Sequence, residues 1–207
     1  MRDQRYTEDP RHTAANDLNR CFYAVTFDAG ITAALAAEIA ALARHRADVR
    51  WSGMGNLHLT LRFLGEIGPD ALAEAVRLLE SGRGLHPFTL RTRGLGAYPS
   101  LRAPRVIWAG VEGEARTDLD HLLALQKQTE SWARAIGLPA EQRPYAPHIT
   151  LGRVARPSAG LQELMNEVIT RPFESGFCRI DSVALMRSEL RPDGARYTTI
   201  AAAGLAV

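Results

Sequence analysis

The chain carries one short pattern twice, and this duplication limits its possible folds more than any other feature. The copies read His-Leu-Thr-Leu at 58–61 and His-Ile-Thr-Leu at 148–151, so their first residues lie 90 positions apart. In both copies polar and apolar residues alternate with the period of two that is typical of a strand with one buried face. Segments recur around each copy in the order helix, strand, helix, strand, strand. We therefore predict two structurally related halves.

Apolar periodicity and helix-capping residues place the individual elements. Helices are predicted from an N-cap at Asp28 to about Arg46, from Pro69 to a stop at Gly82, over 115–136, and after a cap at Ser158. Strands are predicted over 20–27, 56–65, 88–96, 105–111, 148–154, 177–187 and 195–203. The strands are too closely spaced, and too weakly apolar on both faces, for a doubly wound parallel sheet.

These elements predict an α+β fold. We expect two lobes of antiparallel sheet, related by a pseudo-dyad, with helices on the outside and a cleft between them. Residues 20–207 are expected to form this single bilobed domain, with the marker strands at 58–61 and 148–151. Residues 1–19 are polar and are expected to form a flexible N-terminal arm.

Composition excludes several broad classes of protein. The 207 residues are 46% hydrophobic and carry a formal net charge of +2, which is ordinary for a globular protein and too mild to require a nucleic-acid partner. Without a secretory segment or an apolar run of about 18 residues, we expect a cytoplasmic protein that does not enter a membrane. Cys21 and Cys178 are expected to be buried, reduced thiols. A chain that builds its own cleft is expected to be a monomer without an obligate protein partner.

The alternation within the marker strands assigns their side chains to faces. His58 shares a face with Thr60, and His148 shares a face with Thr150, while the intervening leucines and isoleucine point the other way. The apolar face is suited to packing under helices. If the lobes are related by a dyad, the two His-Thr pairs meet across one groove.

Two histidines beside one groove suit phosphodiester cleavage. Imidazole has a pKa of about 6.5, so one ring can accept a proton from an attacking water while the other donates a proton to the departing oxygen. Hydroxyls from Thr60 and Thr150 would donate hydrogen bonds to the phosphate oxygens. Arg153 follows His148 by five residues, and a bulge or a strand end after Gly152 would turn its positive charge into the groove.

Other uses of these histidines are weighed against this one. A single H-x-T on a strand is more often a structural histidine, but two copies at corresponding places are harder to explain in that way. A zinc site is not expected, because neither copy has an aspartate or glutamate at ligand spacing. No phosphate-binding glycine loop and no nucleophile elbow occurs in the sequence, so no cofactor is predicted.

Together these motifs resemble a known family. The sequence is similar to the two-histidine phosphoesterases and, among them, to the bacterial and archaeal RNA 2′,3′-cyclic phosphodiesterases, also called 2′-5′ RNA ligases. The resemblance runs from Arg20 to about Leu205. It rests on RCFYA at 20–24, NLHLTLRFLG at 56–65, PRVIW at 104–108, PHITLGR at 147–153 and RSELRPDGARY at 187–197.

The resemblance implies metal-independent hydrolysis of 2′,3′-cyclic phosphates, on RNA ends or on nucleotides, to 2′-phosphomonoesters. His58, Thr60, His148 and Thr150 match the catalytic positions, and Arg153 matches an arginine that contacts phosphate. By the family's usual mechanism, His148 activates water and His58 protonates the departing 3′-oxygen. The reverse 2′-5′ ligation is expected as a minor activity at most.

Aromatic residues near the motifs are further candidates for substrate binding. Phe22 or Tyr23 is a candidate for stacking on the terminal base, with core packing as the alternative. Tyr145 and Tyr197 are candidates for the rim of the cleft. An alternative function is a catalytically silent nucleotide- or RNA-binding module that uses the same cleft, although such a protein would be expected to have lost a histidine or threonine.

Overall fold

A computed structural model of the protein describes residues 18–82, 84–191 and 194–206. Most of the predicted N-terminal arm therefore lies outside the described residues. The described helices are α1 (Ala29–Ala43), the short 3-10 helix η1 (Met54–Asn56), α2 (Pro69–Ser81), α3 (Arg116–Ala135) and α4 (Leu161–Thr170). The described strands are β1 (Asn19–Val25), β2 (Val49–Trp51), β3 (Leu59–Ile67), β4 (Phe88–Tyr98), β5 (Val106–Gly113), β6 (His148–Val154), β7 (Glu174–Ile180), β8 (Ser182–Arg191) and β9 (Gly194–Gly204).

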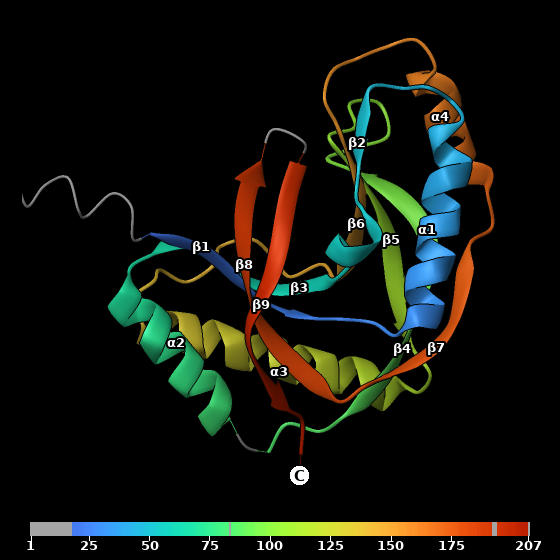
Figure 1. The fold of residues 1–207 in the computed structure, drawn as a ribbon. Helices are drawn as coiled ribbons and strands as arrows, with labels where there is room; N and C mark the ends of the chain where they lie inside the picture. Colours follow the sequence, from blue (N-terminus) through green and yellow to red (C-terminus); the bar gives the residue numbers. More distant parts are fainter. Residues whose placement is uncertain (1–17, 83, 192–193, 207) are drawn as a thin grey trace, which may run out of the picture.

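The strands form one curled antiparallel sheet in the order β7-β4-β5-β6-β3-β1-β8-β9, with β2 also paired to β6 (Figure 1). One lobe contains β2, β4, β5, β6 and β7, and the other contains β1, β3, β8 and β9. The two marker strands, β3 and β6, join the lobes through a single register pair, Leu59 with Ile149. The predicted α+β class and its antiparallel lobes are confirmed, and the join makes the two lobes parts of one sheet.

The helices cover one face of this sheet. In the first lobe, α1 packs on β2, β6 and β7, and α4 packs on β4. In the second lobe, α2 packs on β8 and β9, while α3 packs on β3 and reaches β4 and β5 (Figure 1). The main hydrophobic core lies between this face and the helices. Within the described part of the chain, no helix is both long and apolar enough to cross a membrane.

The repeat is visible in the order of the elements. Apart from β2, η1, β7 and β9, the series β1-α1-β3-α2-β4 is followed by the series β5-α3-β6-α4-β8. The two series occupy corresponding places on either side of the join, because β3 matches β6, β1 matches β5 and β4 matches β8 in the sheet order. Each half therefore opens with a strand, one element earlier than the sequence pattern indicated, and each half contributes strands to both lobes.

Local chemistry explains where the helices begin. Asp28 caps α1 as predicted, since its Oδ1 accepts a hydrogen bond from the backbone N–H of Ile31 at 2.9 Å. Pro69 occupies the first turn of α2, where a missing N–H costs nothing. Cys21 and Cys178 are buried free thiols, as expected, and burial raises the pKa of Cys21 to about 11.

Three details differ from the predicted elements. Ser158 does not cap α4, because its hydroxyl accepts a hydrogen bond from the N–H of Asp48 and Gly160 is the N-cap in a left-handed conformation. The single strand predicted over 177–187 is two strands that separate at Asp181, with β7 paired to β4 and β8 paired to β1. The short strand β2 was not predicted at all.

The join between the lobes is expected to be important for stability. Leu59 and Ile149 are both 0% exposed. Leu59→Ala removes buried methyl groups where little can move to fill the space, so we expect the free energy of unfolding to fall by about 2–5 kcal/mol. Urea unfolding measures this change. Leu190→Ala, at a side chain that is 74% exposed, is the control and should change it by less than about 0.5 kcal/mol. Equal effects of the two substitutions would contradict the importance of the join.

Candidate active site

The two predicted His-Thr pairs lie on the same face of the sheet, at the join. Leu59 and Ile149 are buried on the helix-covered side, so the residues that flank them point to the opposite side. Because the two strands are antiparallel, the pairing of Leu59 with Ile149 brings Thr60 alongside His148, and His58 alongside Thr150. We call the surface that carries these four side chains the histidine face.

Both histidine rings are held in the same way. Nδ1 of His58 lies 2.8 Å from the carbonyl oxygen of Asn56, and Nδ1 of His148 lies 2.8 Å from the carbonyl oxygen of Ala146. A carbonyl oxygen only accepts hydrogen bonds, so each Nδ1 carries a proton and donates it. In each neutral ring Nε2 therefore carries the lone pair that can accept a proton, and the imidazolium so formed can release that proton again. The repeat thus reproduces the tautomer as well as the residue.

The surroundings of the two rings differ. Nε2 of His58 lies 3.0 Å from the hydroxyl oxygen of Thr60, and the ring stacks on Phe22 with centroids 4.8 Å apart. Burial lowers the pKa of His58 to about 4, and the positive charge of Arg153 contributes in the same direction. His148 is half-buried beside Tyr98 and Trp108, and among the described residues no side chain forms a hydrogen bond with its Nε2.

Arg153 reaches the histidine face through a bulge at Leu151, which comes before Gly152 and not after it as expected. The β5–β6 register pairs Trp108 with Thr150 but Ile107 with Gly152, which leaves Leu151 as an extra residue. The extra residue reverses the alternation, so Arg153 is exposed on the side of the histidines. Its effect on the pKa of His58 agrees with this position.

An equivalent bulge in β3 places Phe63, a residue that sequence reasoning missed. The β1–β3 register pairs Ala24 with Thr60 but Tyr23 with Arg62, so Leu61 is extra as Leu151 is in β6. Phe63, the counterpart of Arg153, is turned outward, is 51% exposed and lies 5.7 Å from Phe22, centroid to centroid. Phe63 follows His58 by five residues, as Arg153 follows His148, and this equal spacing could have indicated from the sequence that Phe63 lies at the histidine face.

The predicted roles of Phe22 and Tyr23 in base stacking need correction. Tyr23 is in the main core, where its ring packs on Trp132 and its hydroxyl donates to the carbonyl oxygen of Ala75 at 2.9 Å. Phe22 faces the histidines but is only 1% exposed, because neighbouring rings cover it. It therefore supports the ring of His58 and presents no free face to a base.

The two tyrosines predicted at the rim have different positions. Tyr145 packs against the main core, and its hydroxyl donates to the backbone carbonyl oxygen of Thr60 at 3.1 Å. It therefore holds the segment before β6 against β3 instead of presenting its hydroxyl to a ligand, which corrects the prediction. Tyr197 of β9 packs edge-on against His58 with centroids 5.0 Å apart.

Two aromatic residues beside His148 were also missed. Tyr98 packs edge-on against the His148 ring at 5.0 Å, and Trp108 lies 6.5 Å from it, centroid to centroid. The indole of Trp108 occupies the space where any side chain at Gly96 would lie. Neither contact could be inferred from the sequence, because Tyr98 and Trp108 come close to His148 only through the pairing of β4, β5 and β6.

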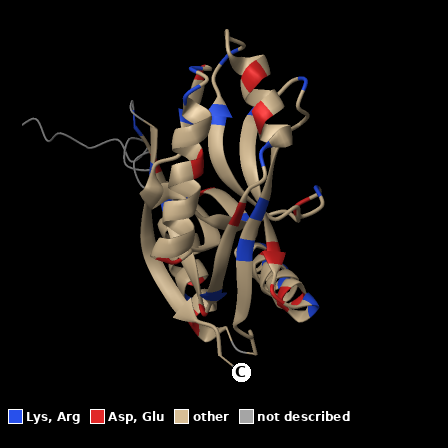
Figure 2. Ribbon diagram, turned by 90° about the vertical axis from the view of Figure 1, so that its right-hand side faces the viewer, with Lys and Arg blue, Asp and Glu red and all other residues tan. Residues whose placement is uncertain are grey.

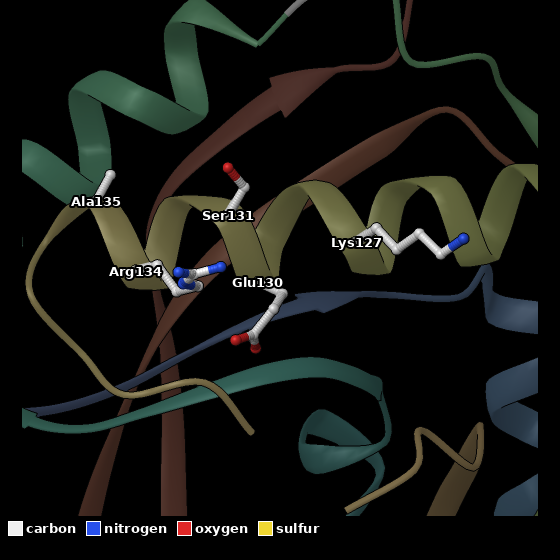
Figure 3. Close-up of a pocket in the computed structure, with 5 residues that line it drawn as sticks. All are labelled: Lys127, Glu130, Ser131, Arg134 and Ala135. Carbon is white, nitrogen blue, oxygen red and sulfur yellow. The ribbon is translucent and has the colours of Figure 1, made fainter. Parts of the chain in front are cut away.

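Other features of the surface are separate from the histidine face. An open hollow of about 460 Å³ runs along α3 and is lined by Lys127, Glu130, Ser131, Arg134 and Ala135 (Figure 3). None of these residues comes from a marker strand, and Glu130 is already paired with Arg62 of β3 at 2.5 Å.

Basic and acidic residues are interspersed over helices and strands (Figure 2). No group of three or more potential metal ligands occurs in residues 18–82, 84–191 and 194–206.

The duplicated fold and the facing His-Thr strands are those of a two-histidine phosphoesterase. A family model described as "LigT like Phosphoesterase" matches residues 26–108 and 116–197, one range in each half of the repeat. The chain therefore belongs to the LigT-like phosphoesterase family.

Three known proteins illustrate the similarity. The RNA 2′,3′-cyclic phosphodiesterase of Methanothermobacter thermautotrophicus is 34% identical over 183 residues, which cover 86% of this chain and 95% of that protein. The crystal structure of TT0787 of Thermus thermophilus is similar with a TM-score of 0.73 and 30% identity, covering 90% of this chain and 97% of that one. The structure of Escherichia coli LigT complexed with 3′-AMP has a TM-score of 0.71 and 28% identity, covering 91% and 98% of the two chains.

The acidic pKa of His58 can be tested directly. In the free protein we expect the His58 ring to titrate near pH 4, and Arg153→Gln to raise this pKa because it removes a positive neighbour. NMR titration of the ring signals measures both values. Arg44→Gln, on the helix-covered side, is the matched control and should leave the pKa unchanged.

The lowered pKa of His58 also makes the free energy of unfolding depend on pH. Since the pKa of an unfolded histidine is about 6.5, the unfolded chain binds this proton more readily, and the stabilising contribution is lost as the pH falls from about 6.5 toward 4. A His58 midpoint near 6.5, insensitive to Arg153→Gln, would contradict the burial of this ring.

Proposed function

We propose that the protein hydrolyses 2′,3′-cyclic phosphates, at RNA ends or on nucleotides, to 2′-phosphomonoesters. The observation that carries this proposal is the pair of histidines at the join, each with Nδ1–H fixed on a carbonyl oxygen and Nε2 available for proton transfer. Paired imidazoles on one face supply the acid and the base that displacement at phosphorus needs. Membership of the LigT-like family and similarity to named RNA 2′,3′-cyclic phosphodiesterases support it.

The reaction assigns a different task to each histidine. Water attacks phosphorus and gives a proton to Nε2 of His148, while the bond from phosphorus to the 3′-oxygen breaks. His58 donates the Nε2 proton to that oxygen, so the products are a 2′-phosphomonoester and a free 3′-hydroxyl. Nε2 of His58 lies 3.0 Å from the Thr60 hydroxyl, whereas Nε2 of His148 has no hydrogen bond to a described side chain, and this difference supports His148 as the base that takes a proton from water.

His58 must acquire its proton when the substrate binds. With a pKa of about 4 in the free protein, the ring is neutral at pH 7. The negative charge of the bound phosphate favours the imidazolium form and raises this pKa. Binding of the cyclic phosphate thus favours protonation of His58, the acid of the cleavage step. In the free protein, His58 stays neutral near the positive charge of Arg153.

The remaining polar groups stabilise charge on the phosphate. Thr60 and Thr150 present hydroxyls on the same face as the histidines and would donate to the non-bridging oxygens as negative charge develops. Arg153 would supply a compensating positive charge. These side chains supply the acid, the base and the phosphate contacts that the proposed step needs. The reverse reaction, which joins a cyclic end to a 5′-hydroxyl through a 2′-5′ bond, uses the same groups and is expected to be minor because water is abundant.

Substitution of either histidine tests the proposal. His58→Ala and His148→Ala should each lower kcat on a 2′,3′-cyclic mononucleotide by at least about 100-fold, because each removes one of two proton-transfer groups. Product formation is followed chromatographically with EDTA present, and the wild-type rate should not change with the chelator. His86→Ala is the control, since this exposed histidine stacks on His121 away from the join.

Two outcomes would count against the mechanism. Near-normal turnover by either single variant would exclude the two-histidine step. Tight binding of a 2′-nucleotide by the wild-type protein without turnover of any cyclic phosphate would favour the alternative of a silent binding module.

A further inference from the structure

Two arginines lie directly opposite each other next to the candidate site. The β2–β6 register pairs Arg50 with Arg153. On either side of this pair, Val49 is opposite Val154 and Trp51 is opposite Gly152. A Cβ placed on Gly152 would lie 2.7 Å from the Val49 side chain, so these flanking residues face the helix-covered core. By alternation, Arg50 and Arg153 both face the other way, onto the histidine face.

Such a pair is unfavourable unless something else compensates it. Side chains directly opposite on antiparallel strands have Cβ atoms about 4.5–5.5 Å apart, and like charges at that separation destabilise the sheet. Both arginines are exposed. Among the described residues, no carboxylate lies within ion-pair distance of either one, although Asp48, two residues before Arg50, pairs with Arg156.

Other arginines of the same sheet are arranged differently. Arg91 and Arg93 of β4 are paired with Glu112 of β5 and Glu174 of β7. Those ion pairs compensate the positive charges of Arg91 and Arg93 within the protein. No described carboxylate compensates the Arg50–Arg153 pair, so its two guanidinium groups can bind anions from outside the chain. Guanidinium groups bind phosphate through parallel hydrogen bonds, which makes phosphate the expected anion.

The position of Arg50 shows which phosphate it can address. The lobes join at Ile149 of β6, and the Arg50–Arg153 pair lies four residues further along that strand. Both arginines are therefore displaced from the histidine pair along β6 by the same amount, which is less than about 13 Å at about 3.3 Å per residue because Leu151 is an extra residue. The turn that follows β2 is fixed to β6, because the Ser52 hydroxyl donates to the Thr150 carbonyl oxygen at 2.9 Å. The two arginines differ in the strand that carries them: Arg153 lies on the marker strand β6, and Arg50 lies beside it on β2. Arg153 is among the charges that lower the pKa of His58, whereas Arg50 is not, so Arg153 is the arginine assigned to the phosphate at the histidines and Arg50 to a neighbouring one.

We propose that Arg50 binds the phosphate that precedes the cyclic end, while Arg153 contacts the cyclic phosphate itself. Two phosphates of one strand would then offset the repulsion between the two arginines. The inference rests on the proposed function and extends it, since it makes the 3′ end of an RNA strand, and not a free mononucleotide, the preferred substrate. A phosphate on the 5′-oxygen of a mononucleotide offers the same chemistry, and the test separates the two sources.

The experiment compares three substrates: a 2′,3′-cyclic mononucleotide, the same compound with a 5′-phosphate, and a trinucleotide with a cyclic end and a 5′-hydroxyl. Arg50→Gln should lower kcat/KM for the trinucleotide about tenfold, mainly through KM, because it removes a charged contact to phosphate. It should also make the dependence of log kcat/KM on log salt less steep by about 0.7. Turnover of the plain cyclic mononucleotide should stay within about twofold of wild type.

Two further variants separate charge from structure. Arg50→Lys keeps the charge and should retain the salt dependence of the wild-type protein. Arg44→Gln removes an exposed arginine from the helix-covered side of the same lobe and should affect none of the substrates. If the Arg50→Gln loss already occurs with the 5′-phosphorylated mononucleotide, the subsite binds the phosphate on the terminal ribose. If it occurs only with the trinucleotide, the subsite requires an internucleotide phosphate.

The contrary results are distinct. Equal losses on all three substrates would place Arg50 at the cyclic phosphate and overturn the second subsite. The absence of any loss would overturn it as well. If wild-type protein turns over none of the three, the proposed function fails first, and this result differs from a selective or absent effect of Arg50→Gln.

Discussion

The pairing of Leu59 with Ile149 is the constraint on which the rest of this structure depends. It is the one register pair that joins the two lobes, and both side chains are fully buried beneath the helices. Side chains alternate along a strand, so burying these two residues forces the histidine and threonine on either side of each onto the opposite face. Hydrophobic burial therefore assembles the polar site. The same apolar pair that stabilises the fold sets the distance between the two histidines.

The two halves of the repeat share a backbone arrangement, but the side chains around their histidines differ. Equivalent bulges at Leu61 and Leu151 turn the following residues onto the histidine face, but one half presents Phe63 and the other presents Arg153. His58 lies against Phe22 and loses hydration, which lowers its pKa, and its Nε2 is 3.0 Å from the Thr60 hydroxyl, whereas Nε2 of His148 has no hydrogen bond to a described side chain. Because the two repeats share a backbone and differ in these neighbours, one pattern yields two histidines with different surroundings, to which we assign the roles of acid and base.

Local patterns predicted much of this, and non-local contacts account for what they missed. The marker strands and the Asp28 cap follow from spacing within a few residues. The same spacing indicated that the alternation must break near Gly152, but the position of the bulge at Leu151 depends on the pairing of β6 with β5. The failures at Phe22 and Tyr23 arise because β1 is buried on both faces, so its composition does not distinguish a side chain under the helices from one behind His58. The division at Asp181 reflects pairing with β4 and β1, which are distant in sequence. Arg50 acquires its meaning only when β2 pairs with β6, about a hundred residues away.

The most direct test of this account is the fate of the water oxygen. A 2′,3′-cyclic mononucleotide is incubated with the protein in ¹⁸O-labelled water and EDTA, and the product isomer and its label are read by chromatography and mass spectrometry. We expect a 2′-phosphomonoester that carries one ¹⁸O atom on phosphorus, since water attacks there and the 3′-oxygen leaves. A 3′-phosphate would reverse the assigned leaving oxygen, and a product formed only after divalent metal is added would contradict catalysis by the two histidines.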